Sequence, residues 1–235
     1  MSSTNESRLY EQATFSVLPN RPGYLVELSN GSDSFAVFLA SGKDVPLATD
    51  AHHWGFVLNG GATLESAAGS FSLKAGMYFT VPGNAQLGGN ALVFSQHSYR
   101  GVFLVGGPIE NEGRLRYIDG CSDSLLIPPI VKGDACLNYL HIPPETDQTA
   151  HTHPSFRVGI VVGGLGQCRT DQGIFELKTG NTFVIHADRI HSFHTGEQSL
   201  SVIAFHPDSD FGPTHEDHPM INRTIVDSQL EGHDE

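Results

Sequence analysis

The chain has few basic residues and lacks a long apolar run. It holds 13 lysines and arginines against 26 aspartates and glutamates, which gives a formal charge of −13. Such a charge opposes binding to nucleic acid, whose phosphates are also negative. No apolar run is long enough to cross a membrane, and residues 1–12 lack the apolar segment of a signal peptide. We therefore expect a cytoplasmic protein with neither nucleic acid nor membrane as a partner.

Cysteine is scarce as well. Cys121, Cys136 and Cys168 are odd in number and scattered, so they do not form a disulfide framework. Glycine and proline are abundant instead, at 26 and 13 residues, and long helical periodicity is rare. This composition favours many strands and turns, and hence an all-β protein. The length of 235 residues allows two small domains or one large β domain.

The chain repeats itself. Residues 55–87 align without a gap onto residues 159–191, with turn glycines on turn glycines and apolar residues on apolar residues. Matched pairs include Gly55 with Gly159, Gly60 with Gly164, Gly69 with Gly173, Gly76 with Gly180, and Phe79 with Phe183. Glycine is the residue that adopts positive φ cheaply, so shared glycines indicate shared turns. The alignment predicts a duplicated barrel.

Three histidines in the second copy are candidate metal ligands. His151 and His153 are two residues apart, and on a β-strand such residues point to the same face. His191 follows a strand-like run at residues 181–185, so in an antiparallel barrel it can return beside that pair. Imidazole is a common ligand for zinc, iron, nickel and copper. We predict a three-histidine metal site; the alternative is that one or two of these histidines are surface residues.

These motifs resemble those of the cupin superfamily. The first cupin motif runs G-x5-H-x-H-x3,4-E-x6-G, and this chain has both histidines but Arg157 in place of the glutamate. The second motif runs G-x5-P-x-G-x-x-H-x3-N, and this chain keeps Gly180 and His191, with His186 in the place of the proline. The resemblance implies an all-β fold of two cupin barrels in tandem, each a double-stranded β-helix or jelly roll.

The repeat and the resemblance together predict two domains. Residues 1–108 would form an N-terminal degenerate barrel without metal ligands. Residues 109–235 would form a C-terminal barrel with the histidine site and an acidic tail. The resemblance and the presence of unpaired edge strands also lead us to expect a homodimer.

The metal is expected to be catalytic. Three neutral imidazoles leave coordination positions for water and substrate, whereas structural zinc sites are closed by four protein ligands. Ligand type leaves Fe²⁺, Zn²⁺, Ni²⁺, Mn²⁺ and Cu²⁺ open. Fe²⁺ is the first choice because three-histidine cupins, which this chain resembles, are often oxygenases. The expected function is a non-haem iron dioxygenase for a small anionic or enolisable substrate. A metal-dependent lyase or isomerase, or a non-catalytic sensor that binds a metal or small ligand, is the alternative.

Arg157 is the first candidate catalytic residue. An arginine cannot ligate a metal and stays protonated, so beside a metal it would favour an anion and clamp a carboxylate. Alternatively Arg157 faces solvent, or forms an internal salt bridge with Glu145 or Asp188. His186 is the second candidate, as a fourth ligand or proton shuttle, or else a residue of the barrel rim. Tyr139 is a further candidate general base for a lyase or isomerase.

The first copy lacks the ligands. The gapless register places Leu47, Thr49 and Leu87 where the second copy has its three histidines, which predicts a closed apolar interior. His52 and His53 are adjacent, so on a strand one would pack inside and the other would face solvent.

Two further histidine groups are not expected to bind metal. His194 comes three residues after His191, so strand alternation directs it to the opposite face. The polar segment near the C-terminus, with His206, His215 and His218, is expected to be a solvated loop, and a lid or subunit contact is the alternative.

Overall fold

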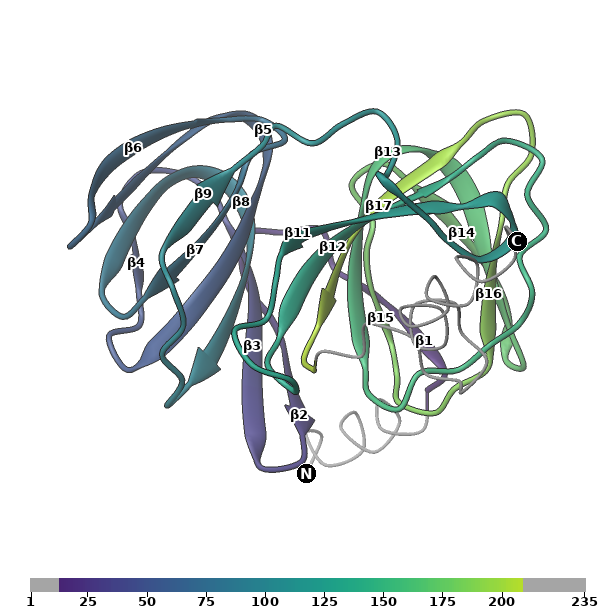
Figure 1. Cartoon of the computed structure of the whole chain (residues 1–235), viewed down its shortest axis with the longest axis horizontal. Helices are drawn as coiled ribbons and strands as arrows, with labels where there is room; N and C mark the ends of the chain where they lie inside the picture. Colours follow the sequence, from purple (N-terminus) through teal and green to yellow (C-terminus); the bar gives the residue numbers. More distant parts are fainter. Residues whose placement is uncertain (1–12, 209–235) are drawn as a thin grey trace, which may run out of the picture.

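The structure is a computed structural model that describes residues 13–208. These residues form two antiparallel β-barrels side by side (Figure 1). Apart from a short 3₁₀ turn, η1 (Ile118–Gly120), the described elements are all strands. The prediction of an all-β fold with two jelly-roll barrels in tandem is confirmed. None of the described residues belongs to a helix long and apolar enough to span a membrane.

The first barrel has eight strands in the order β2-β3-β8-β5-β7-β9, with β4 on β8 and β6 on β5. Their bounds are β2 (Gly23–Asn30), β3 (Asp33–Ala40), β4 (Val45–Leu47), β5 (Ala51–Ser66), β6 (Gly69–Lys74), β7 (Tyr78–Pro82), β8 (Ala85–His97) and β9 (Leu104–Gly106). The long strands β5 and β8 pair with each other along most of their lengths. One end of β5 pairs with β7 and the other with β6, so β5 and β8 run through both layers of the barrel.

The second barrel repeats this arrangement, with the strand order β1-β15-β13-β17-β12-β11-β10 and with β14 and β16 on β13. Its strands are β1 (Phe15–Leu18), β10 (Leu115–Arg116), β11 (Ser122–Ile127), β12 (Cys136–Ile142), β13 (Arg157–Thr170), β14 (Gly173–Lys178), β15 (Thr182–Ile185), β16 (His191–His194) and β17 (Leu200–His206). Here β13 runs through both layers, while β16 and β17 together take the place of β8.

One strand crosses the expected domain boundary. β1 comes from the first 108 residues but pairs with β15, so in Figure 1 its purple ribbon lies among the green strands of the second barrel. The ring of Phe15 on β1 stacks on Phe183 at 5.1 Å and lies 4.8 Å from Phe175. β1 thus pairs what would otherwise be an open edge of β15. The expected division at residues 108 and 109 is therefore wrong for this strand.

The repeat is visible in the packing of two glycines. Gly55 pairs with Phe79 across β5 and β7, and Gly159 pairs with Phe183 across β13 and β15. In each barrel a Cβ on the glycine would overlap the ring of the phenylalanine. The ring lies over the glycine in both barrels, so each phenylalanine can fill its barrel only because its neighbour has no side chain.

The gapless register fails after residue 83 of the first copy. Ala85 pairs with Ser66 in the first barrel, whereas His191 pairs with Thr170 in the second. The turn between β15 and β16, residues 186–190, is longer than the turn between β7 and β8, residues 83–84. The counterpart of His191 is therefore Ala85, and the expectation that it is Leu87 is wrong.

The two barrels share a hydrophobic core. Phe94 of β8 stacks on Phe205 of β17 with ring centroids 4.4 Å apart, and Trp54 and Phe35 contact Phe205 edge-on. Because side chains alternate along a strand, the residues between those of the shared core point into the interior of their own barrel. For example, Val158 of β13 belongs to the shared core, while Val161 lies in the interior cluster of the second barrel.

Candidate metal centre

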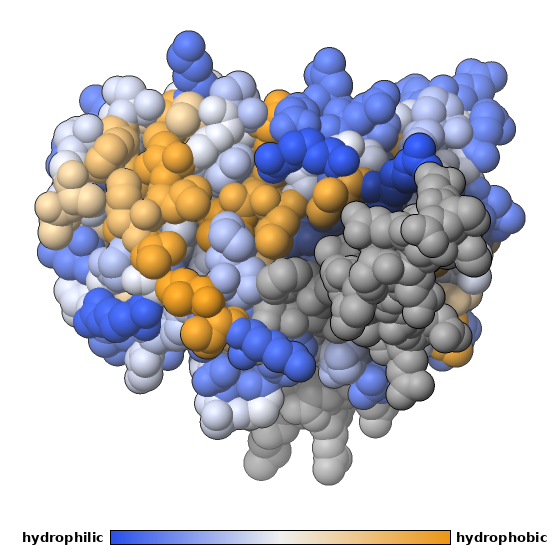
Figure 2. Space-filling model, in the orientation of Figure 1, coloured by the Kyte–Doolittle hydropathy of each residue, from blue (hydrophilic) through white to orange (hydrophobic). Residues whose placement is uncertain are grey.

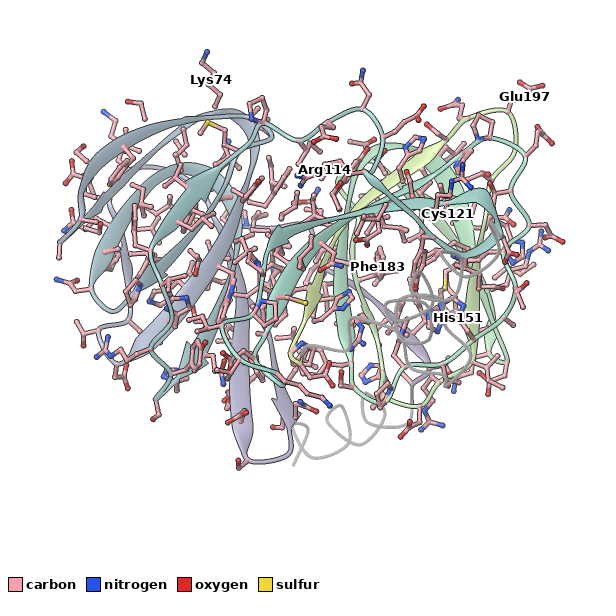
Figure 3. All side chains as sticks on the ribbon, viewed as in Figure 1. Lys74, Arg114, Cys121, His151, Phe183 and Glu197 are labelled. Atoms are coloured by element: carbon pink, nitrogen blue, oxygen red, sulfur yellow. The ribbon has the colours of Figure 1, made fainter. Side chains whose placement is uncertain are left out.

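The structure brings the three predicted ligands together in the second barrel. One ring nitrogen from each of His151, His153 and His191 lies within 4.8 Å of the other two. The ring centroids are 4.6 Å apart for His151 and His191, and 5.1 Å apart for each pair that includes His153. His191 is buried and the other two are half-buried. Figure 3 shows His151 on the second-barrel side of the molecule.

The histidine pair does not lie on a continuous strand, contrary to expectation. His151 forms an isolated bridge with His191, in which each backbone N–H donates to the other's carbonyl at 3.0 Å. His153 lies in the loop before β13, where its carbonyl accepts a hydrogen bond from the N–H of Asp188 at 2.7 Å. Pro154 follows directly and has no N–H, which interrupts the ladder at this point. The bridge to His191 and the hydrogen bond from Asp188 thus fix the backbone of His151 and His153, although neither residue lies in a strand.

The segment that leads to His151 is fastened along β16. The N–H of Thr146 donates to the Thr195 hydroxyl at 2.9 Å, and the N–H of Phe193 donates to the Gln148 side chain at 3.0 Å. The ring of His194 contacts the Asp147 carboxylate through Nδ1. His194 therefore connects the segment before His151 to β16 and lies outside the cluster of three histidines.

Two of the candidate ligands have a tautomer that leaves Nε2 free to bind a metal. Nδ1 of His151 lies 2.9 Å from the carbonyl of Thr149, and Nδ1 of His191 lies 2.9 Å from that of Arg189. A carbonyl only accepts, so each Nδ1 carries the proton and each Nε2 keeps its lone pair. Nε2 of His191 is buried and has no hydrogen-bond partner among the described residues. A buried polar atom left unpaired is costly, and a metal ion would satisfy it. The cluster therefore fits a metal.

Two of the three histidines of the cluster have lowered pKa values and are therefore uncharged. Burial lowers the pKa of His153 to about 2, with smaller contributions from Arg157 and the other two histidines. Burial also lowers the pKa of His191 to about 4, although the carbonyl of Arg189 opposes the shift. Both imidazoles are thus neutral at neutral pH, which is the form that ligates metals.

Arg157 faces the interior of the second barrel. Its side chain is 4% exposed and shares a strand face with Gly159 and Val161, so the solvent-facing interpretation is wrong. Its Nη1 donates to the carbonyl of Phe156 at 3.0 Å and forms an ion pair with Asp208 at 3.3 Å. Among the described residues the acidic partner of Arg157 is therefore Asp208, and neither Glu145 nor Asp188 as expected from the sequence.

His206 belongs to this interior, so the expectation that it lies in a solvated loop is wrong. It ends β17 on the face shared with Val202, and its ring centroid lies 6.5 Å from that of His153. Burial, and then Arg157 and His153, hold the pKa of His206 well below its usual range. The sequence predicts the last strand at residues 200–205, one residue too short. Extending the alternation of that strand by one step would have identified His206.

The other candidates lie elsewhere. His186 is outside the cluster of three histidines. Its Nε2 lies 3.2 Å from the hydroxyl of Ser16, and its backbone N–H donates to the carbonyl of Thr14. It therefore joins the N-terminal segment to the second barrel. The hydroxyl of Tyr139 donates to the carbonyl of Asn111 at 2.9 Å within the shared core, so its assignment as a general base is wrong. His215 and His218 lie outside the described residues.

His52 and His53 of the first barrel are both buried, so the expectation that one faces solvent is wrong. Nδ1 of His53 lies 2.7 Å from the Ser95 hydroxyl in the barrel interior. His52 faces the other way, where its ring contacts Trp54 at 4.5 Å and Tyr99 at 5.3 Å. The second barrel packs against this face, which explains why no exposed side remains.

Comparisons with known proteins agree with this architecture. Residues 142–218 match the AraC-like ligand binding domain family. The fold is similar to that of the protein YlbA from E. coli, with a TM-score of 0.62, 16% identity, and 89% of this chain and 99% of that chain covered. A cupin 2 conserved barrel domain protein from Leptotrichia buccalis gives a TM-score of 0.58 and 13% identity, with 86% and 93% covered. This chain has the bicupin fold.

A further similarity of this bicupin is to an enzyme. Salicylate 1,2-dioxygenase from Pseudaminobacter salicylatoxidans has a TM-score of 0.58 and 11% identity to it, with 77% of this chain and 76% of that chain covered. A search of curated protein sequences finds no match. The bicupin fold is thus shared with proteins of different descriptions, and its function has to be argued from the second-barrel site.

Proposed function

We propose that this bicupin is a metal-dependent oxidoreductase of the non-haem iron dioxygenase class, acting on a small anionic or enolisable substrate. The observation that carries the proposal is the cluster of three imidazoles, in which the buried Nε2 of His191 has no partner among the described residues. Within residues 13–208, no carboxylate or thiolate belongs to the cluster, which leaves room for exogenous ligands. The similarity to a salicylate dioxygenase supports this reaction class at the level of the fold.

The residues of the chain have distinct roles in this proposal. His151, His153 and His191 would hold Fe²⁺, which when bound would supply the centre where substrate and dioxygen exchange electrons. Arg157, fixed by Asp208, places a permanent positive charge in the same interior. That charge attracts an anionic substrate and balances negative charge that develops on it. His206 lies beside them as a neutral hydrogen-bonding group.

A non-catalytic sensor is the second candidate. The match to the AraC-like ligand binding domain covers all three histidines, and that family is described by ligand binding. A sensor would bind the same metal and anion without turnover. Measurement of both binding and dioxygen consumption separates the two candidates.

The first experiment measures the metal content of the full chain, purified without chelators or a histidine tag. We expect about one iron per chain, lost in His151→Ala. His141→Ala is the matched control, because His141 lies on β12 with its Nδ1 against Ser201 and outside the cluster. It should keep the metal. Absence of metal from the unmodified chain after reconstitution would refute the proposal, and bound zinc or nickel would favour a lyase or isomerase.

The second experiment tests the anion. Dioxygen uptake is measured with salicylate and with small enolisable carboxylates. In Arg157→Gln we expect KM for a carboxylate substrate to rise by roughly tenfold or more, because the charged hydrogen bonds are lost. Metal content should stay unchanged, since Arg157 is not a ligand. Metal binding without uptake on any of these compounds would support the sensor.

A further inference from the structure

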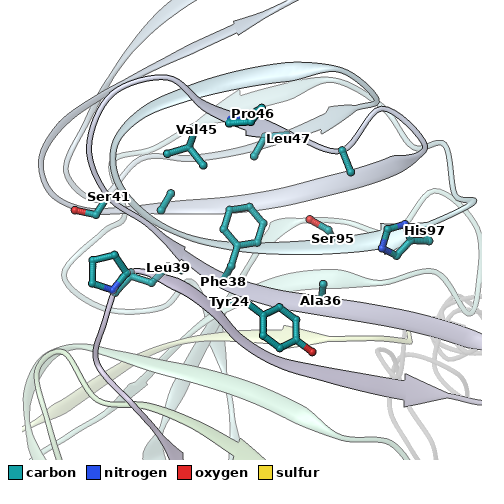
Figure 4. Close-up of a pocket in the computed structure, with 14 residues that line it drawn as sticks. Tyr24, Ala36, Phe38, Leu39, Ser41, Val45, Pro46, Leu47, Ser95 and His97 are labelled. Atoms are coloured by element: carbon teal, nitrogen blue, oxygen red, sulfur yellow. The ribbon is translucent and has the colours of Figure 1, made fainter.

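The first barrel contains a cavity of about 430 Å³ near one end. Its walls come from β2, β3, β4 and β8, and Figure 4 shows the rings of Tyr24 and Phe38 on one side and residues of β4 on the other. The expected closed apolar interior is therefore wrong at this end. A volume of this size lies in the range of sites for small molecules.

The cavity borders on positions that correspond to the candidate metal centre of the second barrel. Leu47 pairs with Ala85 in the first barrel as His151 pairs with His191 in the second. Leu47 lines the cavity, so one of its walls corresponds directly to a metal ligand.

A second wall gives the same correspondence. Val93 pairs with Gly55 as Ala204 pairs with Gly159. Two residues further along each strand, Ser95 of β8 therefore corresponds to His206 of β17. Ser95 also lines the cavity. Two residues that line the chamber, Leu47 and Ser95, thus stand where the second barrel has His151 and His206.

The lining shows what the chamber could accept. It includes no Lys, Arg, Asp or Glu, although the chain carries a formal charge of −13. Phe38, Val45 and Leu47 provide apolar surface, and Tyr24, which is 58% exposed, lies at the opening. The space-filling view shows apolar side chains over much of the visible face of the first barrel (Figure 2). A charged ligand would lose its hydration here without gaining an opposite charge.

Polar groups are confined to a few positions of the lining. The hydroxyl of Ser95 lies 2.7 Å from Nδ1 of His53, and His97 lies two residues further along β8. A ligand with a single hydroxyl or carbonyl group can be oriented by these side chains, while its rings rest against the apolar walls.

We propose that the first barrel binds an uncharged, ring-bearing small molecule of about bicyclic size that carries one hydroxyl or carbonyl group. An engineered cavity of roughly 150 Å³ accommodates benzene, so the larger chamber has room for two fused rings and a polar substituent. The site is separate from the metal centre and does not depend on the proposed reaction there.

The test uses 2-naphthol as the probe and the full chain. Binding is measured by isothermal titration calorimetry, with 2-naphthoate as the charged analogue. We expect 2-naphthol to bind with a 1:1 stoichiometry, and 2-naphthoate to bind at least about tenfold more weakly because its charge is not compensated. Equal binding of both compounds would refute the proposed ligand class. Absence of 2-naphthol binding at its solubility limit would refute the site.

Two variants locate the binding site. Ala36 lines the cavity on β3 and is half-buried, so Ala36→Phe should fill it and weaken 2-naphthol binding by about tenfold or more. Ala48→Trp fills it from an exposed position and serves if the first variant does not fold. Ala68→Trp is the matched control, because Ala68 is exposed at the β5–β6 turn and outside the lining. Unchanged affinity in both filling variants would place 2-naphthol elsewhere and refute the proposal.

A last variant separates this site from the metal centre. His151→Ala should bind 2-naphthol as the unmodified chain does, whatever its metal content. Loss of 2-naphthol binding in His151→Ala would assign the ligand to the second barrel and overturn the inference.

Discussion

The two barrels have the same frame and different interiors. Both place a phenylalanine ring over a glycine of the neighbouring strand, and both use a long strand that passes through two layers. Yet the second barrel points histidines and an arginine inward where the first has mostly small and apolar residues. The comparison shows that strand pairing and turns define the barrel, while a few interior positions define its chemistry.

The difference is concentrated at four interior positions. His151, His191, Arg157 and His206 of the second barrel correspond to Leu47, Ala85, His53 and Ser95 of the first. The first set offers imidazole nitrogens and a guanidinium group, whereas Leu47 and Ser95 of the second set line a cavity without Lys, Arg, Asp or Glu.

The largest effect is expected from transferring the ligands. The triple variant Leu47→His, Thr49→His, Ala85→His should raise the metal content from about one to about two ions per chain. Strand pairing makes Leu47 and Ala85 equivalent to His151 and His191, and Thr49 follows Leu47 at the spacing of His153 from His151. Elemental analysis measures the content. The control replaces Ala85→His with Leu87→His, which follows the gapless sequence register, and should gain no metal. A gain in the control alone would show that our correspondence is misplaced.

The first barrel should contribute to acid sensitivity through a buried histidine of its own, in addition to the histidines of the second barrel. Burial, and then His53 and Arg100, lower the pKa of His52 from 6.5 to about 4. Between these values the folded chain binds fewer protons than the unfolded chain, so the free energy of unfolding falls as the pH drops through this window. For a shift of this size the loss is about 3 kcal/mol.

His52→Gln is the variant that tests this pH dependence. Urea unfolding from pH 7 to pH 4 should show a shallower decline than in the unmodified chain, whatever the absolute stability of the variant. Equal slopes would mean that His52 is protonated alike in both states. Phe156 occupies the corresponding position in the second barrel, where the histidines with a lowered pKa are instead His153, His191 and His206.

The shared frame should be sensitive at the same place in both barrels. A methyl group on Gly55 or Gly159 would overlap the ring of Phe79 or Phe183, which is buried and has no room to move. We expect Gly55→Ala and Gly159→Ala each to lower the free energy of unfolding by about 2 kcal/mol. Chemical denaturation measures the loss. Adding Phe183→Leu to Gly159→Ala should recover part of it, and purely additive losses would contradict the overlap.

The smallest effect is expected from loosening the segment before His151. Asp147 contacts the ring of His194, so Asp147→Ala should weaken metal binding by about tenfold without abolishing it, as is usual for residues that position a ligand. Competition with a chelator measures the affinity. Arg169→Ala is the control, because Arg169 contacts the same carboxylate only at 3.5 Å and is exposed. Equal losses in both variants would argue against a specific role for His194.

Much of this architecture could be predicted from local signals. Turn glycines such as Gly69 and Gly173 adopt the positive φ that their alignment implied, at 128° and 136°. The spacing of His151 and His153 indicated a common target even though the pair lies off a strand. These predictions succeeded because they depend on short-range rules for turns and side-chain spacing.

The remaining features depend on partners distant in sequence. Nothing near Arg157 indicates that its carboxylate partner is Asp208, because the two meet only when β13 and β17 pair. The added turn length before His191 shifts the register without changing the apolar pattern, so an alignment by pattern passes over it. The same long-range pairing accounts for the unexpected position of β1.

The placement of β1 also governs the order in which the molecule can be completed. Ser16 and His186 are in contact although they are 170 residues apart. A ribosome adds about 5–20 residues per second, so the first strand waits roughly ten seconds or more for the segment it must join. During synthesis its apolar residues Phe15 and Val17 remain available to other chains, which makes crowding of nascent copies a hazard. A fragment that begins after the first barrel would lack this strand and leave β15 open at one edge.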